Sequence, residues 1–462
     1  MRFIDLFAGL GGFHHALGQL GHECVFVSEI NEELRDLYAL NFKGTKGLLH
    51  GDIRKVRAKV PPHDILAAGF PCQPFSKSGK QHGRADKTRG TLFDEILKIL
   101  RKHHPRYVIL ENVGNFERHD GGDTWKIVRE SLEKLHYNVR GTTHVTTGGH
   151  GLISPHHLGF PQTRERFFIV ASTEPLPEDP FPPASRSRIT SLAELVEDAR
   201  RLSVKERQEI ALTGQQLACI DHWNAFVWAI PADIELPSFP LWGDEFGARY
   251  PYADVPPMKA KLSALRSTIR HEQFLPNPRK AQLLSLLPAY ARRSNKRFPD
   301  WKIRFIRQNR SYYRKIQDYL PSGWRERLDE FPASLRKLEW NCNGEERDLW
   351  QCVLQFRPSG LRAKRYTSSP ALVAMTTTQI PILGPERRFL TRREGLRLQG
   401  FPDTHRLPTS RQDAFAALGN AVHTGVVLAI AHRLLYGKPH ELELAASGDA
   451  EEAEIQVSAV SR

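Results

Sequence analysis

Residues 3–172 alternate between short apolar runs and amphipathic stretches, and this alternation constrains the fold more than any other feature of the chain. The apolar runs are 3–8, 24–29, 64–69, 107–110 and 167–170. Apolar strands that alternate with helices form βαβ units, whose parallel sheet is covered on both faces. The pattern therefore predicts a doubly wound α/β fold with a mostly parallel sheet.

The alternation stops at a proline-rich stretch, 174–187, which can continue neither a helix nor a strand. From there to about residue 380 the sequence is irregular and rich in Trp, Pro and Arg. Amphipathic helical patterns return in 392–398 and 421–435, and an acidic end follows. We therefore predict domains at 1–172 and 173–380, a return segment at 381–437, and an acidic, disordered tail at 438–462.

The charge balance narrows the class of partner. The chain has 66 Lys and Arg against 52 Asp and Glu, a net charge of +14. This excess favours a polyanion such as nucleic acid, although many soluble proteins are basic without one. The five cysteines are irregularly spaced, which argues against a disulfide scaffold or zinc module and favours an intracellular protein. We find no signal peptide and no apolar run of the roughly 18 residues that span a bilayer.

A glycine-rich turn, Phe7–Gly12, joins the first predicted strand to the first helix, at the sheet edge where such folds bind ligands. Glu29 ends the next strand, where a carboxylate can accept hydrogen bonds from ribose hydroxyls, and Asp52 could hold a base or amino group. The third glycine of a dinucleotide fingerprint is missing, because residue 14 is His14. The turn fits a nucleoside-containing cofactor, or a tight turn beside a solvated acid.

Two further strands are followed by reactive side chains. Cys72 follows the strand 64–69 between two prolines, and the polar, basic segment 76–90 is typical of a mobile lid over an anionic substrate. Cys72 is a candidate nucleophile, against the usual interpretation of a cysteine as a small buried hydrophobe. Glu111 ends the strand 107–110, where apolar neighbours can raise its pKa and make it a proton donor. The alternative for Glu111 is a satisfied edge acid.

Two basic features follow along the chain. Arg164 and Arg166 lie two residues apart in a predicted strand, so their side chains share a face and could clamp a phosphate or a carbonyl. On an ordinary edge strand they would be solvated. Residues 291–315 carry ten basic residues against one acid, Asp300, with aromatic residues interleaved. Such a segment favours contact with phosphates, and a solvated basic face is the alternative.

Six sequence blocks resemble those of the DNA cytosine-5 methyltransferases, in the same order, over residues 3–430. The blocks are Phe7–Gly12, Gly69–Gln73, Glu111–Val113, Gln162–Arg166, Leu390–Glu394 with Leu398–Pro402, and Gly419–Val422. The departures are small: His14 and His15 in the first helix, and Ile30 where an aromatic residue is common after the acid. Ile30 should stack less well on the adenine of the cofactor.

The resemblance implies a class I S-adenosylmethionine-dependent fold that methylates carbon 5 of cytosine in a specific short sequence of double-stranded DNA. It implies that the Cys72 thiolate adds to carbon 6 of a base flipped out of the duplex. Glu111 would hydrogen-bond the ring nitrogen and exocyclic amine, while Arg164 and Arg166 would hold the base and its phosphate. Arg164 is also a candidate for favouring the thiolate.

The resemblance also assigns the remaining site residues and the domains. The cofactor-binding residues are expected to be Phe7, Gly9, Gly11, Glu29, Asp52, Pro71, Asn420 and Val422, and no metal is needed. The DNA-binding residues are expected to be Gln73, Ser76, Arg297, Arg304, Arg307 and Arg310. Residues 1–172 would form the catalytic domain, 173–380 the target recognition domain, and 381–437 the part that completes the catalytic domain.

The family's commonest setting is bacterial restriction and modification. By this analogy we expect a cytoplasmic, monomeric enzyme without membrane contact, and a cognate restriction endonuclease encoded nearby. Two alternatives stay open. One is an RNA cytosine-5 methyltransferase with the same motifs, against which the long insert argues. The other is a catalytically silent, sequence-specific DNA-binding protein, against which the intact Cys72, Glu111, Arg164 and Arg166 argue.

Overall fold

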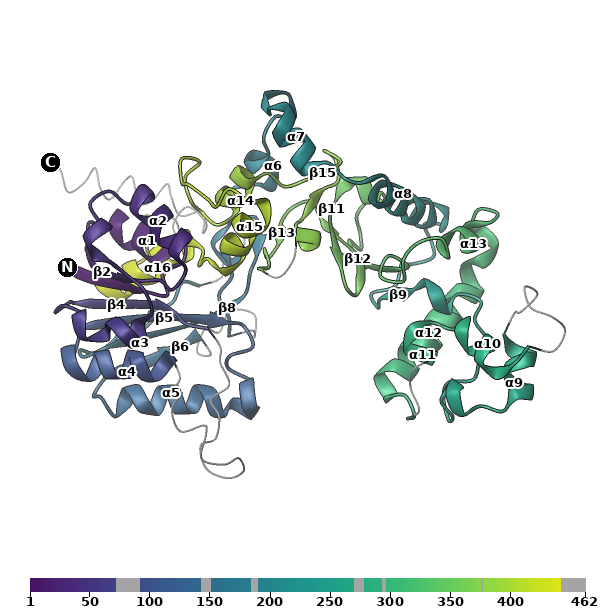
Figure 1. Ribbon diagram of the computed structural model, residues 1–462, viewed down its shortest axis with the longest axis horizontal. Helices are drawn as coiled ribbons and strands as arrows, with labels where there is room; N and C mark the ends of the chain where they lie inside the picture. The colour runs from purple at the N-terminus through teal and green to yellow at the C-terminus, as the bar shows by residue number, and fades with distance from the viewer. Residues whose placement is uncertain are drawn as a thin grey trace. The chain divides into compact units, whose positions relative to one another are not determined.

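The computed structural model divides the chain into two compact units. It describes residues 1–71, 92–142, 151–183, 190–269, 278–292, 296–374 and 377–441 (Figure 1). Unit 1 comprises Met1–Glu209, Thr367–Thr377 and Leu390–Arg462, and unit 2 comprises Ile210–Tyr366 and Thr378–Phe389. Unit 2 is therefore an insertion in unit 1. The predicted lid at 76–90 and nearly all of the predicted acidic tail lie outside the described residues.

Unit 1 is built on a seven-stranded sheet in the order β3-β2-β1-β4-β5-β8-β6. The strands are β1 (Arg2–Leu6), β2 (Glu23–Ser28), β3 (Leu49–His50), β4 (Ile65–Gly69), β5 (Tyr107–Val113), β6 (Asn138–Gly141) and β8 (Arg166–Ser172). The first five strands pair in parallel, and β8 is antiparallel to both β5 and β6. The predicted doubly wound, mostly parallel sheet is confirmed.

Both faces of this sheet are buried. Successive side chains of a strand point to opposite faces, so each central strand contributes to two hydrophobic cores. In β4, Ile65 and Ala67 belong to one hydrophobic core, while Leu66 and Ala68 belong to the other. Helices on opposite sides of the sheet complete these two cores (Figure 1). The first group is α1 (Gly12–Gln19), α2 (Glu32–Asn41) and α16 (Thr424–Tyr436), and the second is α3 (Ile53–Val56), α4 (Leu92–His103) and α5 (Asp123–Glu133). The strand order reverses between β1 and β4, which is where open α/β sheets leave a crevice for ligands.

The return segment packs into unit 1 through α14 (Arg392–Leu398), α15 (Arg411–Asn420) and α16. Residues Arg411–Tyr436 are long and apolar enough to cross a membrane, but 89% of the tested stretch is buried inside the protein. The apolar character therefore belongs to core helices. The helix expected from residue 421 begins at Thr424, where the His423 side chain accepts a hydrogen bond from the Val426 amide (3.3 Å) and caps it.

Residues 173–209, which we expected in the second domain, group with unit 1. Acidic side chains in this segment pair with arginines of α14. Arg393 bonds Glu197 (2.5 Å) and Glu206 (3.2 Å), and Arg392 pairs with Glu209. Two short helices lie here, α6 (Leu192–Leu195) and α7 (Val204–Ile210). These ion pairs join residues almost 200 positions apart in the sequence. No local sequence pattern therefore indicates that residues 173–209 belong to unit 1.

Unit 2 contains a six-stranded sheet in the order β15-β14-β11-β12-β10-β9, where the sequence analysis expected irregular structure. The strands are β9 (Leu241–Trp242), β10 (Lys337–Asn341), β11 (Cys352–Arg357), β12 (Gly360–Arg365), β14 (Ile382–Leu383) and β15 (Arg388–Phe389). The helices are α8 (Gly214–Ala229), α9 (Leu262–Thr268), α10 (Lys280–Ser285), α11 (Ala289–Arg292), α12 (Asp300–Ile316) and α13 (Trp324–Leu328). Three of these strands have only two residues, which is too short for a periodic pattern.

Candidate active site

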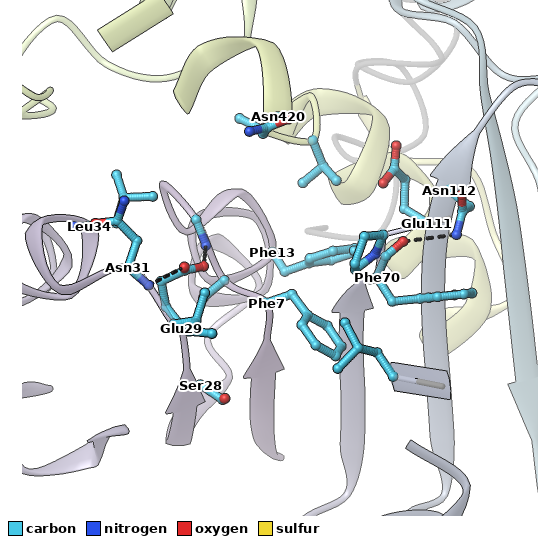
Figure 2. A pocket seen from close by; sticks show the side chains of 18 of the residues that line it. Phe7, Phe13, Ser28, Glu29, Asn31, Leu34, Phe70, Glu111, Asn112 and Asn420 are labelled. Atoms are coloured by element: carbon cyan, nitrogen blue, oxygen red, sulfur yellow. Dashed lines mark hydrogen bonds between the residues drawn. The ribbon is translucent and has the colours of Figure 1, made fainter. Parts of the chain in front are cut away.

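A pocket of about 550 Å³ lies at the carboxyl ends of β1, β2, β4 and β5, within unit 1. Its lining includes seven of the eight predicted cofactor residues and three of the four predicted catalytic ones. These are Phe7, Gly9, Glu29, Asp52, Pro71, Asn420 and Val422, with Glu111, Arg164 and Arg166. Figure 2 shows Glu29 and Asn31 on one side of the pocket, Glu111 and Asn112 on the other, and Phe7 and Phe13 between them.

The glycine turn is shaped by close contacts that only glycine permits. Gly9 and Gly11 have φ angles of +53° and +79°, in the left-handed region. A Cβ at Gly11 would lie 2.3 Å from the Phe42 ring, and one at Gly12 would lie 2.5 Å from a methyl group of Val422. Gly11, which does not line the pocket, therefore supports the turn from behind. Gly12 lets the return segment approach the first helix.

The Glu29 carboxylate is fixed at the wall of the pocket. One oxygen accepts a hydrogen bond from the Gly9 amide and the other from the Asn31 amide, both at 2.9 Å (Figure 2). The Asn31 side chain in turn accepts a hydrogen bond from the Leu34 amide (3.1 Å) and so caps helix α2. Beside Glu29, the side chain of Ile30 is 68% exposed at the pocket. The Glu29 carboxylate and the apolar Ile30 side chain thus lie side by side at the pocket, as a site for a ribose and its base would require.

Asp52 is held by its neighbour Arg54. The Arg54 guanidinium donates to both carboxylate oxygens, with Nη2 at 2.6 Å from Oδ2, and the Arg54 amide donates to Oδ1 (3.0 Å). These hydrogen bonds lower the pKa of Asp52, so the group stays ionised. A carboxylate has about four acceptor positions, and Arg54 donates four hydrogen bonds to Asp52, so an amino group in the pocket would have to share or displace one of them.

Glu111 lies at the end of β5, opposite Gly69 of β4 in the sheet. Arg166 Nε donates to Glu111 Oε1 at 2.9 Å. Burial raises the pKa of Glu111, with Arg166 and then Arg164 acting in the opposite direction. The neighbouring Asn112 side chain donates to the Phe70 carbonyl (2.9 Å) and ties β5 to the turn after β4 (Figure 2). A raised pKa is what a proton donor at neutral pH requires.

Arg164 is buried, and its guanidinium donates hydrogen bonds to the backbone. It donates to the carbonyl oxygens of Leu372 (3.2 Å), Gly419 (2.8 Å) and Ala421 (2.7 Å). The strand expected through Arg164 is interrupted there, since β7 (Gln162–Thr163) ends before it and β8 begins after it. Burial lowers the pKa of Arg164 to about 9, so it is still charged at neutral pH. Arg164 thus holds the loop that carries Asn420 and Val422 against the pocket.

Three predicted residues, Cys72, Gln73 and Ser76, lie outside the described residues. Pro71, which directly precedes Cys72, lines the pocket. The other four cysteines are buried. Burial raises the pKa of Cys24 and of Cys219 to about 12 each, which disfavours their thiolates.

The four arginines that we predicted to bind DNA lie in unit 2, in or next to α12, and they differ in surroundings. Arg304 and Arg307 are exposed, and Arg297 pairs with Asp300 at 2.8 Å. Arg310 instead points inward, where Nε donates to the fully buried Glu245 at 2.9 Å. We therefore remove Arg310 from the DNA-contacting set, because its charge is already used inside the protein.

Several residues that line the pocket were not predicted from the sequence. Phe13, Ser28, Leu34 and Arg54 all belong to this group. Phe13 opens the first helix after the glycine turn, and Ser28 directly precedes Glu29. Proximity to a predicted site residue was the only signal available for them.

The sequence comparisons with known proteins agree on one family. The C-5 cytosine-specific DNA methylase family profile matches residues 1–223 and 282–435. The type II methyltransferase M.AluI of Cellulosimicrobium cellulans is 33% identical over 486 residues, which cover 92% of this chain and 90% of the relative. M.HhaI of Haemophilus parahaemolyticus is 44% identical over 171 residues, 37% of this chain and 48% of the relative. A mutant DNMT2 crystal structure from Spodoptera frugiperda gives a TM-score of 0.46 at 16% identity, covering 94% of this chain and 99% of that one.

Proposed function

Since the chain belongs to the C-5 cytosine-specific DNA methylase family and is a DNA (cytosine-5-)-methyltransferase, we propose that it acts through a covalent Cys72 adduct to a flipped cytosine. The target would be a specific short sequence of double-stranded DNA. The observation that carries this proposal is the buried Glu111 carboxyl, whose pKa is raised and which pairs with Arg166. It lies in the pocket that Pro71, the neighbour of Cys72, also lines.

The pocket fits S-adenosylmethionine. Its volume of about 550 Å³ lies within the range of roughly 300–1,000 Å³ that is usual for such sites. The Glu29 carboxylate would take the ribose hydroxyls, Asp52 the adenine amino group, and Ile30 one face of the adenine. Asn420 and Val422 would form the opposite wall. When bound, S-adenosylmethionine supplies the methyl group to carbon 5.

The side chains of the protein would activate the base. The Cys72 thiolate forms a bond to carbon 6 while Glu111 donates its proton to the ring nitrogen, which leaves an enamine that is nucleophilic at carbon 5. After methyl transfer, carbon 5 loses its proton to a base, the bond to Cys72 breaks and the ring nitrogen returns its proton to Glu111, so the thiolate and the protonated carboxyl are both regenerated. Arg166 orients the Glu111 carboxyl through its hydrogen bond. Flipping the target nucleotide costs a few kcal/mol, which contacts with the extruded base must offset.

A trapped adduct tests the proposal. Bisulfite sequencing of DNA from cells that express the protein would first locate the methylated cytosine. A duplex with 5-fluorocytosine at that position cannot lose a proton from carbon 5, so the enzyme should stay attached on a denaturing gel. We expect no adduct with Cys72→Ala and an undiminished adduct with Cys219→Ala, the control for a buried thiol. Binding without any adduct would instead indicate a silent DNA-binding protein, and methylation confined to RNA would indicate the RNA enzyme.

We extend the proposal to the setting of the enzyme. It would act as a monomer in the bacterial cytoplasm, with a cognate restriction endonuclease encoded nearby. Light scattering of the full chain, alone and with duplex, would test the monomer. Loss of viability on deleting this gene alone, but not on deleting it together with a neighbouring nuclease gene, would test the partner.

A further inference from the structure

Helix α12 of unit 2 has two faces of different character. Its inward face contributes Ile303, Ile306, Tyr312 and Ile316 to the interior. The opposite side carries four exposed cations, Arg304, Arg307, Arg314 and Lys315. At about 100° per residue, these four cations lie within roughly 100° of one another around the helix axis. They therefore form one surface, which we call the α12 cationic face.

The α12 cationic face has no counter-charge within the part of the chain that the structure describes. No ion pair joins Arg304, Arg307, Arg314 or Lys315 to a described carboxylate. The two neighbouring arginines of the same segment differ, because Arg297 pairs with Asp300 and Arg310 with Glu245. The exposed cations of α12 without a described carboxylate partner thus lie on one side of the helix, whereas the half-buried Lys302 lies over the rings of Tyr290 and Phe298.

Of the two amide side chains of α12, that of Asn309 is turned inward, and that of Gln308 is partly buried, with no hydrogen-bond partner at its Oε1 among the described residues. Asn309 Oδ1 accepts from the Trp242 amide (2.7 Å), and Asn309 Nδ2 donates to the Pro240 carbonyl (3.1 Å). The α12 cationic face consequently offers charged donors. A DNA backbone offers charged acceptors, whereas base edges present mixed patterns of donors and acceptors.

We propose that the α12 cationic face binds the phosphate backbone of duplex DNA and supplies affinity but not sequence recognition. This inference rests on the proposed function, because it assumes a duplex substrate. The face runs over about 11 residues, or about 16 Å of helix, along which a duplex carries about ten negative charges. Four cations can therefore each meet a different phosphate.

The buried Glu245 fixes α12 to the rest of unit 2 through its ion pair with Arg310. Besides Arg310, the hydroxyls of Tyr250 and Tyr290 donate to its carboxylate. The Arg310 guanidinium also lies 4.4 Å from the centroid of the Tyr250 ring and donates to the Tyr250 carbonyl (3.0 Å). Arg310 is therefore a positioning residue of the helix. For this reason it is not among the residues substituted in the test below.

The test measures how salt changes the affinity of the full chain for two fluorescein-labelled duplexes of about 30 base pairs, one of random sequence and one that contains the methylated target sequence. Arg304→Gln, Arg307→Gln and Arg314→Gln would be combined in one variant. A matched variant combines Lys259→Gln and Arg327→Gln, two exposed cations of unit 2 outside α12. We expect the slope of log affinity against log salt to fall by about 0.9 for each lost phosphate contact, so by about 2.7 in the triple variant. The matched variant should keep the wild-type slope.

Two results would overturn the proposal. One is an unchanged slope and affinity in the triple variant. The other is a loss confined to the methylated target sequence, which would mean that the face reads bases. If the wild type itself forms no 5-methylcytosine, the proposed function fails, whatever the slopes show.

Discussion

Replacing Arg164 by lysine should loosen the cofactor pocket more than it slows chemistry. The Arg164 guanidinium bonds three separate carbonyl oxygens, those of Leu372, Gly419 and Ala421. A lysine ammonium keeps the charge but presents its donors from a single atom, and so it cannot match the fork of the guanidinium. We expect Arg164→Lys to retain one of the three hydrogen bonds.

The magnitude follows from what the lost bonds hold in place. Gly419 and Ala421 flank Asn420, and these residues form one wall of the pocket. Without two of the bonds, one or two residues of this wall must be ordered each time the cofactor binds, at about 1–2 kcal/mol per residue for the backbone. A total of about 1–4 kcal/mol corresponds to roughly a 5- to 900-fold weaker Kd.

The assay is isothermal titration of the full chain with S-adenosylmethionine, together with kcat at saturating substrates. Arg166→Lys is the matched control, because Arg166 contacts Glu111 and not the return segment. We expect Arg166→Lys to lower kcat and leave the Kd for the cofactor within about twofold. Thermal unfolding of both variants checks that each is folded at the assay temperature.

The opposite result would refute this reasoning. If Arg164→Lys binds the cofactor as tightly as the wild type while its kcat falls, then Arg164 acts on the base. That is the role that the resemblance implied. A parallel loss of cofactor affinity in Arg166→Lys would also count against the reasoning, because it would show that any charge change near Glu111 disturbs the pocket.

Three further predictions concern other parts of the structure. Glu111→Gln should lower kcat by about 10²–10⁴. In the wild type kcat should fall as pH rises through the raised pKa of Glu111, since the protonated form is lost, and pH–rate profiles should show no such fall in the variant. Gly11→Ala should destabilise the fold by about 1–3 kcal/mol and weaken cofactor binding, because its Cβ would meet the Phe42 ring, and calorimetry with cofactor titration measures both effects. Glu245→Gln should cost about 3–5 kcal/mol of stability because Arg310 stays buried without its counter-charge, and an unchanged unfolding midpoint would contradict this.

The fold of unit 1 could be predicted because its signals are local. Each central strand is buried on both faces, which leaves an uninterrupted apolar run such as 107–110. The cap at Asn31 and the acids after it lie within four residues of one another. The sheet of unit 2 had no such signal, since β9 has two residues and pairs with β10, which lies almost 100 residues away. Pairing of this kind is decided by tertiary packing.

The arginines of α12 show how far helical periodicity can assign a side chain to the inward or the outward face. Ile303, Ile306 and Arg310 follow the spacing i, i+3, i+7, which places Arg310 on the buried face of a helix. Arg304 falls outside this pattern, but Arg307 takes its i+4 position and is nevertheless exposed. Helical periodicity alone therefore does not distinguish the inward Arg310 from the outward Arg307. The partners of Arg164 could not be found this way, because they lie 208–257 residues further along the chain.

The long sequence separation between Arg164 and its carbonyl partners explains how a recognition unit can be inserted between them without loss of the pocket. The cost of closing a flexible loop grows as about 1.5RT ln n, or about 0.6 kcal/mol for each doubling of its length. Lengthening a connection from roughly 16 to roughly 256 residues therefore costs only about 2.5 kcal/mol. Arg164 makes three charge-assisted hydrogen bonds at net values of about 1.5–3 kcal/mol each, which is enough to offset that cost. One buried guanidinium can thus keep the return segment at the pocket whatever the length of the unit inserted before it.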